Sequence, residues 1–161
     1  MLNIQLVGDR ELIARFQAMP SKVRAALLRK VTALRLKLEA HIKADKLSGQ
    51  VLKVQTGNLR ASIFSQTIDE GDTIIGRAAS SGDVKYAGIH EFGGKTAPHV
   101  IEAKGKALAF MFQGKQAFFK RVNHPGSTMP ERSFMRSSLA DMRTEIVDGM
   151  TEAVKTAAAQ K

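Results

Sequence analysis

Residues 21–47 read SKVRAALLRKVTALRLKLEAHIKADKL, and the apolar residues in this run recur at steps of four, four, three, four and four. Such spacing places them on one face of an α-helix. We therefore expect a long amphipathic helix from about residue 21 to residue 47, packed on a core through that face. The stripe consists of Val23, Leu27, Val31, Leu34, Leu38 and Ile42, widened by Leu28 and Leu36.

The other faces of this helix are strongly basic. Eight lysines and arginines face only two acids, Glu39 and Asp45, so the segment has a net charge of +6. A solvated helix face explains this pattern, and so does a surface that lies against an acidic partner or DNA. Both interpretations stay open. The candidate basic surface comprises Arg24, Arg29, Lys30, Arg35, Lys37 and Lys43.

Downstream, the pattern changes to short β-prone runs. Residues 61–68 and 73–77 flank Asp69-Glu70-Gly71-Asp72, a glycine-containing connection typical of a β-hairpin. Three further runs follow at 99–102, 108–112 and 117–122. The five runs together predict one antiparallel sheet. Between the two groups, residues 86–92 predict a short helical piece that Gly93 and Gly94 end.

The two ends of the chain also carry secondary-structure signals. Residues 3–7 predict a short strand, and Asp9 is a suitable N-cap for a short helix through Phe16. Near the other end, residues 128–131 read TMPE, a capping box with a proline early in the helix. The last helix then carries an apolar stripe of Met135, Leu139, Met142, Ile146, Met150 and Val154.

These elements predict an α+β fold in a single domain over residues 1–161, with a core from about 20 to 155. We expect an antiparallel sheet of about four to five strands, packed against the long N-terminal helix and a C-terminal helix. With 161 residues, 43% of them apolar, the chain has the size and composition of one such domain.

Composition also narrows the function. The chain has no cysteine, which excludes disulfides and thiolate chemistry. We find no signal-peptide pattern and no apolar run long enough to span a bilayer, so we expect a protein made in the cytosol, with no membrane partner. The net charge of +10 suggests a polyanionic neighbour, although a basic soluble protein without one has the same charge.

We find no pattern for catalysis, a cofactor or a metal. The four histidines have no metal-binding spacing, and Gly93-Gly94-Lys95-Thr96 lacks the first glycine of a phosphate loop, where Ile89 stands. Phe110 and Phe112 fall on one strand face, as a base-stacking surface requires. A hydrophobic sheet core requires the same alternation, and we favour that interpretation.

Three stretches resemble the morphogenesis proteins of tailed bacteriophages, which include neck (head–tail connector), tail-completion and minor tail components. They read TGNLRASI at 56–63, YAGIHEFGG at 86–94, and NHPG at 123–126 running into PERSFM at 130–135. The motif positions are Gly57, Asn58, Leu59, Arg60, Tyr86, Glu91, Phe92, Gly93, Gly94, Pro130, Arg132 and Phe134. Ser133 departs from the pattern, since many relatives have a proline there.

The resemblance implies a structural virion protein that joins head to tail or completes the tail by forming a ring or docking into one. Its implied partners are further copies of itself, adjoining neck or tail proteins, and DNA in the lumen. Its implied location is the virion, and the host cytoplasm during assembly. The basic helix face and the loop 123–129 are candidate ring surfaces. The alternative is a basic nucleic-acid-binding module.

Four of the motif positions have specific structural expectations. Phe134 is expected to insert the start of the last helix into the sheet, while Tyr86 and Phe92 anchor their segment on the core. Glu91, where buried, needs a cationic or N–H partner. Arg60 and Arg132 are the candidates for the cation.

Overall fold

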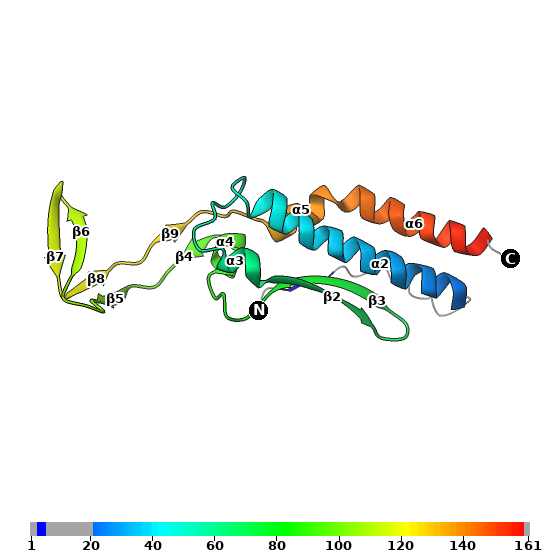
Figure 1. Cartoon of the computed structure of the whole chain (residues 1–161), viewed down its shortest axis with the longest axis horizontal. Helices are drawn as coiled ribbons and strands as arrows, with labels where there is room; N and C mark the ends of the chain where they lie inside the picture. Colours follow the sequence, from blue (N-terminus) through cyan, green and yellow to red (C-terminus); the bar gives the residue numbers. More distant parts are fainter. Residues whose placement is uncertain (1–2, 6–20, 160–161) are drawn as a thin grey trace.

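The computed structural model describes residues 3–5 and 21–159 of the chain. It consists of an elongated body and an arm that projects from one end of the body (Figure 1). The helix expected at 9–16 lies outside the described residues, as does the end of the strand expected at 3–7. We call residues 94–129 the arm throughout.

The long helix forms where the apolar stripe predicts it. Helix α2 spans Ser21–His41 and continues through one π-helical turn, η1, at Ile42–Lys46. The stripe residues from Val23 to Leu38 are buried in α2, and Ile42 is buried in η1. Helix α6 (Arg143–Ala159) lies alongside α2, and a small sheet covers another side of it (Figure 1).

The sheet of the body has three strands in the order β1-β3-β2. Strands β2 (Ile63–Asp69) and β3 (Ile74–Ser80) form the expected hairpin, with a register from Ile63↔Ser80 to Asp69↔Ile74. Strand β1 (Asn3–Gln5) adds to the free edge of β3. Ile63, Ile75 and Ala78 bury their side chains in the body.

The predicted fold class is confirmed: this is an α+β domain with a long N-terminal helix, antiparallel pairing and a C-terminal helix. Its sheets are smaller than expected, because the five β runs do not join in one sheet. Only the first two runs belong to the body. The other three runs form two of the three successive two-stranded ribbons that make up one long hairpin, the arm.

The ribbons of the arm follow one another away from the body. Strands β4 (Gly94–Lys95) and β9 (Thr128–Met129) form its base. Strands β5 (His99–Glu102) and β8 (Arg121–His124) form its stem, and β6 (Leu108–Phe112) and β7 (Lys115–Phe119) form its tip. The run expected at 117–122 is therefore divided between β7 and β8, with Lys120 between them.

The predicted start of the last helix at residues 128–131 is wrong. Thr128 and Met129 belong to strand β9, and helix α5 begins only at Met135 and runs to Asp141. Helix α6 follows after Met142. The local capping box is not used, because a carboxylate from another part of the chain caps the helix. The predicted apolar stripe of the last helix nevertheless faces the core at Met135, Met142 and Ile146, which are buried.

Two short helices complete the body at the root of the arm. Helix α3 (Asn58–Ser62) follows the loop after η1, and α4 (Ala87–Phe92) ends at Gly93, as expected for residues 86–92. The core joins η1, the start of α5 and the sheet around Phe134, whose side chain is fully buried. None of the described helices combines the length and the apolar character needed to cross a membrane.

Candidate assembly surface

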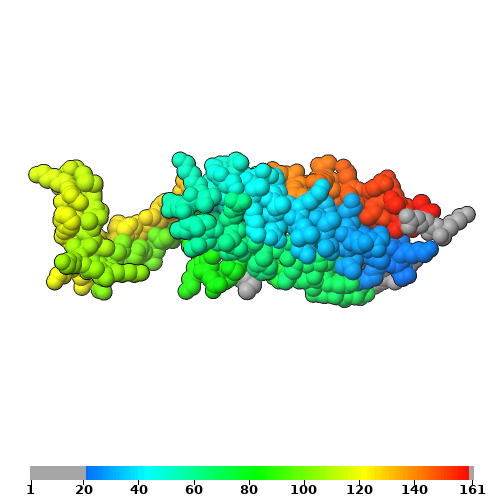
Figure 2. Space-filling model, in the orientation of Figure 1, coloured from blue at the N-terminus to red at the C-terminus, as the bar shows by residue number. Residues whose placement is uncertain are grey.

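The arm is the most unusual feature of the molecule because almost all of it is exposed. Its 36 residues extend away from the body as a thin two-stranded ribbon (Figures 1 and 2). The arm contains six basic residues and one acid, Glu102, so its net charge is +5. Half of the formal charge of the chain therefore lies in this projection.

The tip of the arm is apolar on both faces. In the register Leu108↔Phe119, Phe110↔Ala117 and Phe112↔Lys115, one face carries three phenylalanines, and the Phe110 and Phe119 rings stack with centroids 5.6 Å apart. The opposite face carries Ala109, Met111, Gln116 and Phe118. Met111 is 68% exposed, Phe118 63% and Phe112 55%.

The favoured interpretation of Phe110 and Phe112 as core residues is therefore wrong: both are exposed. The sequence did carry a signal that this strand is not half-buried in a sheet with one core face. The run LAFMF at 108–112 does not alternate, and a continuous apolar run is typical of strands that are covered on both faces. In this chain the tip has no covering layer of its own among the described residues.

The stem has two unlike faces. His99 and Ile101 pair across the ribbon with His124 and Val122, and the two imidazole rings stack with centroids 5.0 Å apart. The other face pairs Val100 with Asn123 and Glu102 with Arg121. The stem thus presents one largely polar side and one side of histidines and β-branched residues, unlike the tip.

Close backbone contacts fix the base of the arm. A Cβ atom on Gly126, whose φ is +87°, would lie 2.2 Å from the carbonyl oxygen of Thr96. A Cβ on Gly93 would lie 2.8 Å from the backbone nitrogen of Glu131. Thr96 and Ser127 bond across the base, with Thr96 N donating to Ser127 O at 2.9 Å and Ser127 N to Thr96 Oγ1 at 2.7 Å. Only glycine permits this approach.

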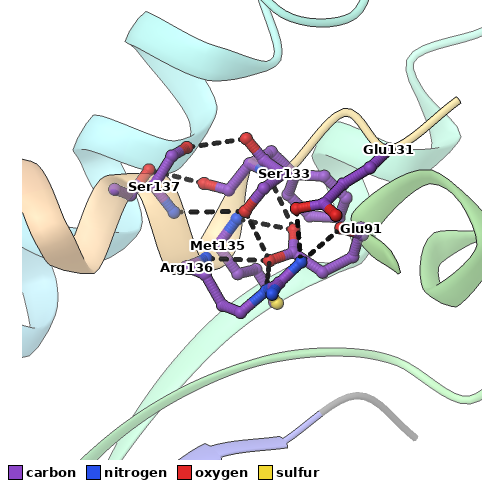
Figure 3. A network of polar contacts seen from close by, with 8 residues as sticks. Glu91, Glu131, Ser133, Met135, Arg136 and Ser137 are labelled. Carbon is purple, nitrogen blue, oxygen red and sulfur yellow. Dashed lines mark hydrogen bonds and ion pairs between the residues drawn. The ribbon is translucent and has the colours of Figure 1, made fainter. Parts of the chain in front are cut away.

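Glu91 holds the root of the arm to the body (Figure 3). Its side chain is completely buried, and its oxygens accept hydrogen bonds from the backbone N–H groups of Phe134, Met135 and Arg136 at 2.8–2.9 Å. The Ser133 hydroxyl donates at 2.8 Å, and Nε of Arg136 at 3.2 Å. The carboxylate therefore caps the start of α5.

These donors determine the charge state of Glu91. Burial alone would raise its pKa, but the N–H groups of Met135, Arg136 and Phe134 outweigh burial and lower the pKa below its ordinary value. Glu91 is therefore ionised at neutral pH. Because it precedes the arm while its donors follow the arm, one carboxylate joins both feet of the projection.

Glu91 is buried and has both the N–H partners and the cation that burial was expected to require, but neither candidate arginine is its cation. That role belongs to Arg136, whose guanidinium also lies over the Phe92 ring, 4.6 Å from its centroid. Arg132 instead uses its backbone N–H to bond His90 O at 2.8 Å. Ser133 supplies a side-chain donor to Glu91 that a proline at this position would lack.

The remaining motif residues divide between the core and the surface. Phe134 is fully buried, as expected, whereas Tyr86 and Phe92 are exposed and do not anchor their segment in the core. Gly57 precedes α3 with φ +77°, and Asn58 N bonds Thr56 Oγ1 at 3.4 Å. Leu59 packs at the edge of the core, and Pro130 is exposed between β9 and α5. Gly94 begins strand β4.

Much of the basic face of α2 is engaged by the body itself. Arg24 pairs with Asp69, Lys37 with Glu145, and Lys43 with Glu39 at 2.6 Å. Arg35 donates to Thr67 Oγ1 at 2.8 Å and to Ser65 Oγ at 2.9 Å. Arg29 stays exposed, and the side chain of Lys30 lies beside Gly149. These residues of α2 are therefore partly occupied by contacts within the chain, and the arm is the more accessible basic surface.

No group of three or more histidine, aspartate or glutamate side chains able to hold a metal ion occurs in the ranges 3–5 and 21–159. The main exposed features of the described residues are the apolar tip and the basic residues of the arm, which are suited to binding another molecule. No family model, curated protein or solved structure matches the chain.

Proposed function

We propose that the chain is a structural subunit of a tailed-phage particle that acts at the neck or tail end. It joins head to tail or completes the tail by assembling into a ring or onto one, and it acts by binding rather than by catalysis. The three motifs that resemble phage morphogenesis proteins support this proposal. The stretch at 86–94 ends at the base of the arm, the stretch at 123–135 begins in the arm and continues to the start of α5, and the stretch at 56–63 includes α3.

The observation that carries the proposal is the tip of the arm, apolar on both faces and exposed on both. An isolated two-stranded ribbon is at best marginally stable in water. A ribbon that also exposes four phenylalanines and a methionine gains most by being covered. A tip with two apolar faces requires cover on both, which a cleft or the junction between two neighbouring subunits provides.

Rotational assemblies supply such a junction. In a ring, one patch of each subunit contacts a different patch on the next subunit. A projecting arm on one subunit and a surface that receives it on the neighbouring subunit are a pair of patches of this kind. A specific interface of this kind buries more than about 1,000 Å². An extended arm that is covered along its length and on two faces contributes a large share of that area.

The runner-up is a basic nucleic-acid-binding module, favoured by the net charge of +5 on an arm that also carries phenylalanines. A stacking platform uses one aromatic face beside a line of cations. Here the aromatic residues occupy both faces of the tip, which has Lys115 as its single cation. This arrangement fits protein burial better.

Two measurements separate these functions. Nucleic-acid binding predicts an affinity that falls steeply with added salt and a protein that stays monomeric or dimeric. Assembly through the tip predicts recruitment to particles that lack the protein, with a weaker dependence on salt. Replacing Phe112 and Phe118 with serine should abolish that recruitment while leaving the lysines in place. Unchanged recruitment of the variant would exclude the tip as the assembly surface.

A further inference from the structure

A basic groove lies on the body beside the root of the arm. It has a volume of about 860 Å³ and is lined by the loop after η1, by α3, and by Tyr86, His90 and Arg132. Lys53, Arg60 and Arg132 line it, and all three are exposed. None of the described residues that line this groove is an aspartate or glutamate. The charged side chains that line the groove are therefore all basic, which suits an anionic occupant.

One polar atom in the wall of this groove lacks a partner. Nδ1 of His90 is buried and has no hydrogen-bond partner among the described residues. Burial and the nearby Arg132 lower the pKa of His90, so its ring is neutral at pH 7. A buried polar atom without a partner is costly. Because this atom is closed off from solvent, the charges of the groove, and not this ring, favour an anionic occupant.

The chain itself carries a matching anionic segment. The end of β2 and the turn after it read Asp69-Glu70-Gly71-Asp72, and all four residues are exposed. This segment is the densest group of acids in the sequence. Asp69 is held by Arg24 and accepts a hydrogen bond from Gly71 N at 3.2 Å, so the turn has a defined shape. Glu70 and Asp72 are its outermost charges.

The groove and the acidic turn lie at opposite ends of the body. The groove lies beside α3 and α4 at the root of the arm, whereas the hairpin β2–β3 points its turn away from the arm (Figure 1). A subunit with a basic recess at one end and an acidic projection at the other is complementary to a copy of itself placed head to tail. Such heterologous contacts build rings when the rotation closes.

We infer that the groove lined by Lys53, Arg60 and Arg132 receives the acidic β2–β3 turn of a second copy of this chain. The inference rests on the proposed function, because it identifies one of the two contacts that a ring requires. The arm tip supplies apolar burial, while this contact fixes the order and orientation of neighbouring subunits.

Charge reversal tests the pairing directly. The groove variant carries Lys53→Glu and Arg60→Glu, and the turn variant carries Glu70→Lys and Asp72→Lys. Self-association of each is measured by analytical ultracentrifugation at low salt, alone and as an equal mixture. Each variant alone should associate roughly tenfold or more weakly than wild type, because like charges then meet. The mixture should recover wild-type association, because each altered surface meets its opposite.

Matched controls keep the test specific. Asp83→Lys reverses an exposed acid outside the turn and should leave association unchanged, and circular dichroism of every variant should match wild type. The Phe112→Ser, Phe118→Ser tip variant is measured in the same assay. If it fails to associate while the groove and turn variants behave like wild type, the pairing is wrong and the proposed function stands. If the tip variant also associates normally, neither the tip nor the pairing drives self-association, and the proposed function is then decided by recruitment to particles.

Two further outcomes are decisive. A mixture of the groove and turn variants that stays as weak as its components contradicts the pairing, because complementary charge then restores nothing. A wild-type protein that stays monomeric at high concentration and low salt contradicts it as well. The pairing also requires that added salt weaken the association of wild type.

Discussion

Glu91 Oε2 accepts a hydrogen bond at 2.8 Å from the backbone nitrogen of Phe134, a residue 43 positions later in the chain. The arm leaves the body just after Glu91 and returns just before Phe134. This single contact therefore closes a long loop and caps helix α5 at the same time. It explains how a thin projection starts from a fixed root on the body.

Replacing Glu91 with glutamine should destabilise the body by about 2–4 kcal/mol, because an amide presents N–H groups to donors that need an acceptor. Urea unfolding measures the change. Glu131→Gln is the control, since Glu131 is exposed and pairs with the outer part of Arg136. We expect the control to cost less than about 1 kcal/mol. Equal stability of the Glu91 variant and wild type would refute the cap.

The lowered pKa of Glu91 predicts a specific dependence on pH. A carboxyl whose folded-state pKa lies below its unfolded value contributes stability that is complete above the unfolded value and is lost as pH falls through the folded one. Stability should therefore decline as pH falls below 4.5, the ordinary value for glutamate. The Glu91→Gln variant should show a smaller decline, measured by urea midpoints from pH 7 to pH 3. Parallel curves for the two proteins would count against this role.

Gly126→Ala should loosen the base of the arm, because the added Cβ meets the Thr96 carbonyl at 2.2 Å and φ is +87°. The backbone then has to shift, and the bonds between Thr96 and Ser127 weaken. Hydrogen exchange at the amides of both residues should accelerate by roughly tenfold or more. Gly105→Ala is the matched control within the arm, since nothing lies within 4 Å of its Cβ position. Identical exchange in the two variants would contradict the account of the base.

The tip phenylalanines should matter little to the stability of the free subunit. Phe112 and Phe118 are largely exposed, so Phe112→Ser with Phe118→Ser should change the free energy of unfolding by less than about 1 kcal/mol. Phe134→Ala, at a fully buried position, should cost about 3–5 kcal/mol. Thermal unfolding compares the two. A large loss of stability in the tip variant would mean that the body covers the tip in solution.

The parts of the fold that sequence predicts are those set by local periodicity. The stripe from Val23 to Ile42 specifies the long helix, and the acidic four-residue turn specifies the hairpin β2–β3. Both signals lie within one element or between adjacent ones, so no knowledge of distant residues is needed.

The parts that sequence reasoning missed depend on residues far apart in the chain. The sequence TMPE at 128–131 has the pattern of a local helix cap. The helix nevertheless begins seven residues after Thr128, at Met135, where the carboxylate of Glu91 caps it. The β-prone runs that form β2 and β6 look alike in sequence, yet β2 lies in the sheet of the body and β6 lies in the arm. A short run does not show whether its strand joins the sheet of the body or a ribbon outside the core. Phe110 lies in the arm and is exposed, because none of the described residues forms a layer over the tip.

The most direct test of the central claim is the mass of particles assembled with and without the tip. Phage particles that lack this protein are mixed with wild type or with the Phe112→Ser, Phe118→Ser variant, and the bound protein is measured by native mass spectrometry of the isolated neck and tail assemblies. The account predicts a fixed number of wild-type copies in each assembly and none of the variant. Equal incorporation of both, or normal infectivity of particles that never receive the protein, would contradict it.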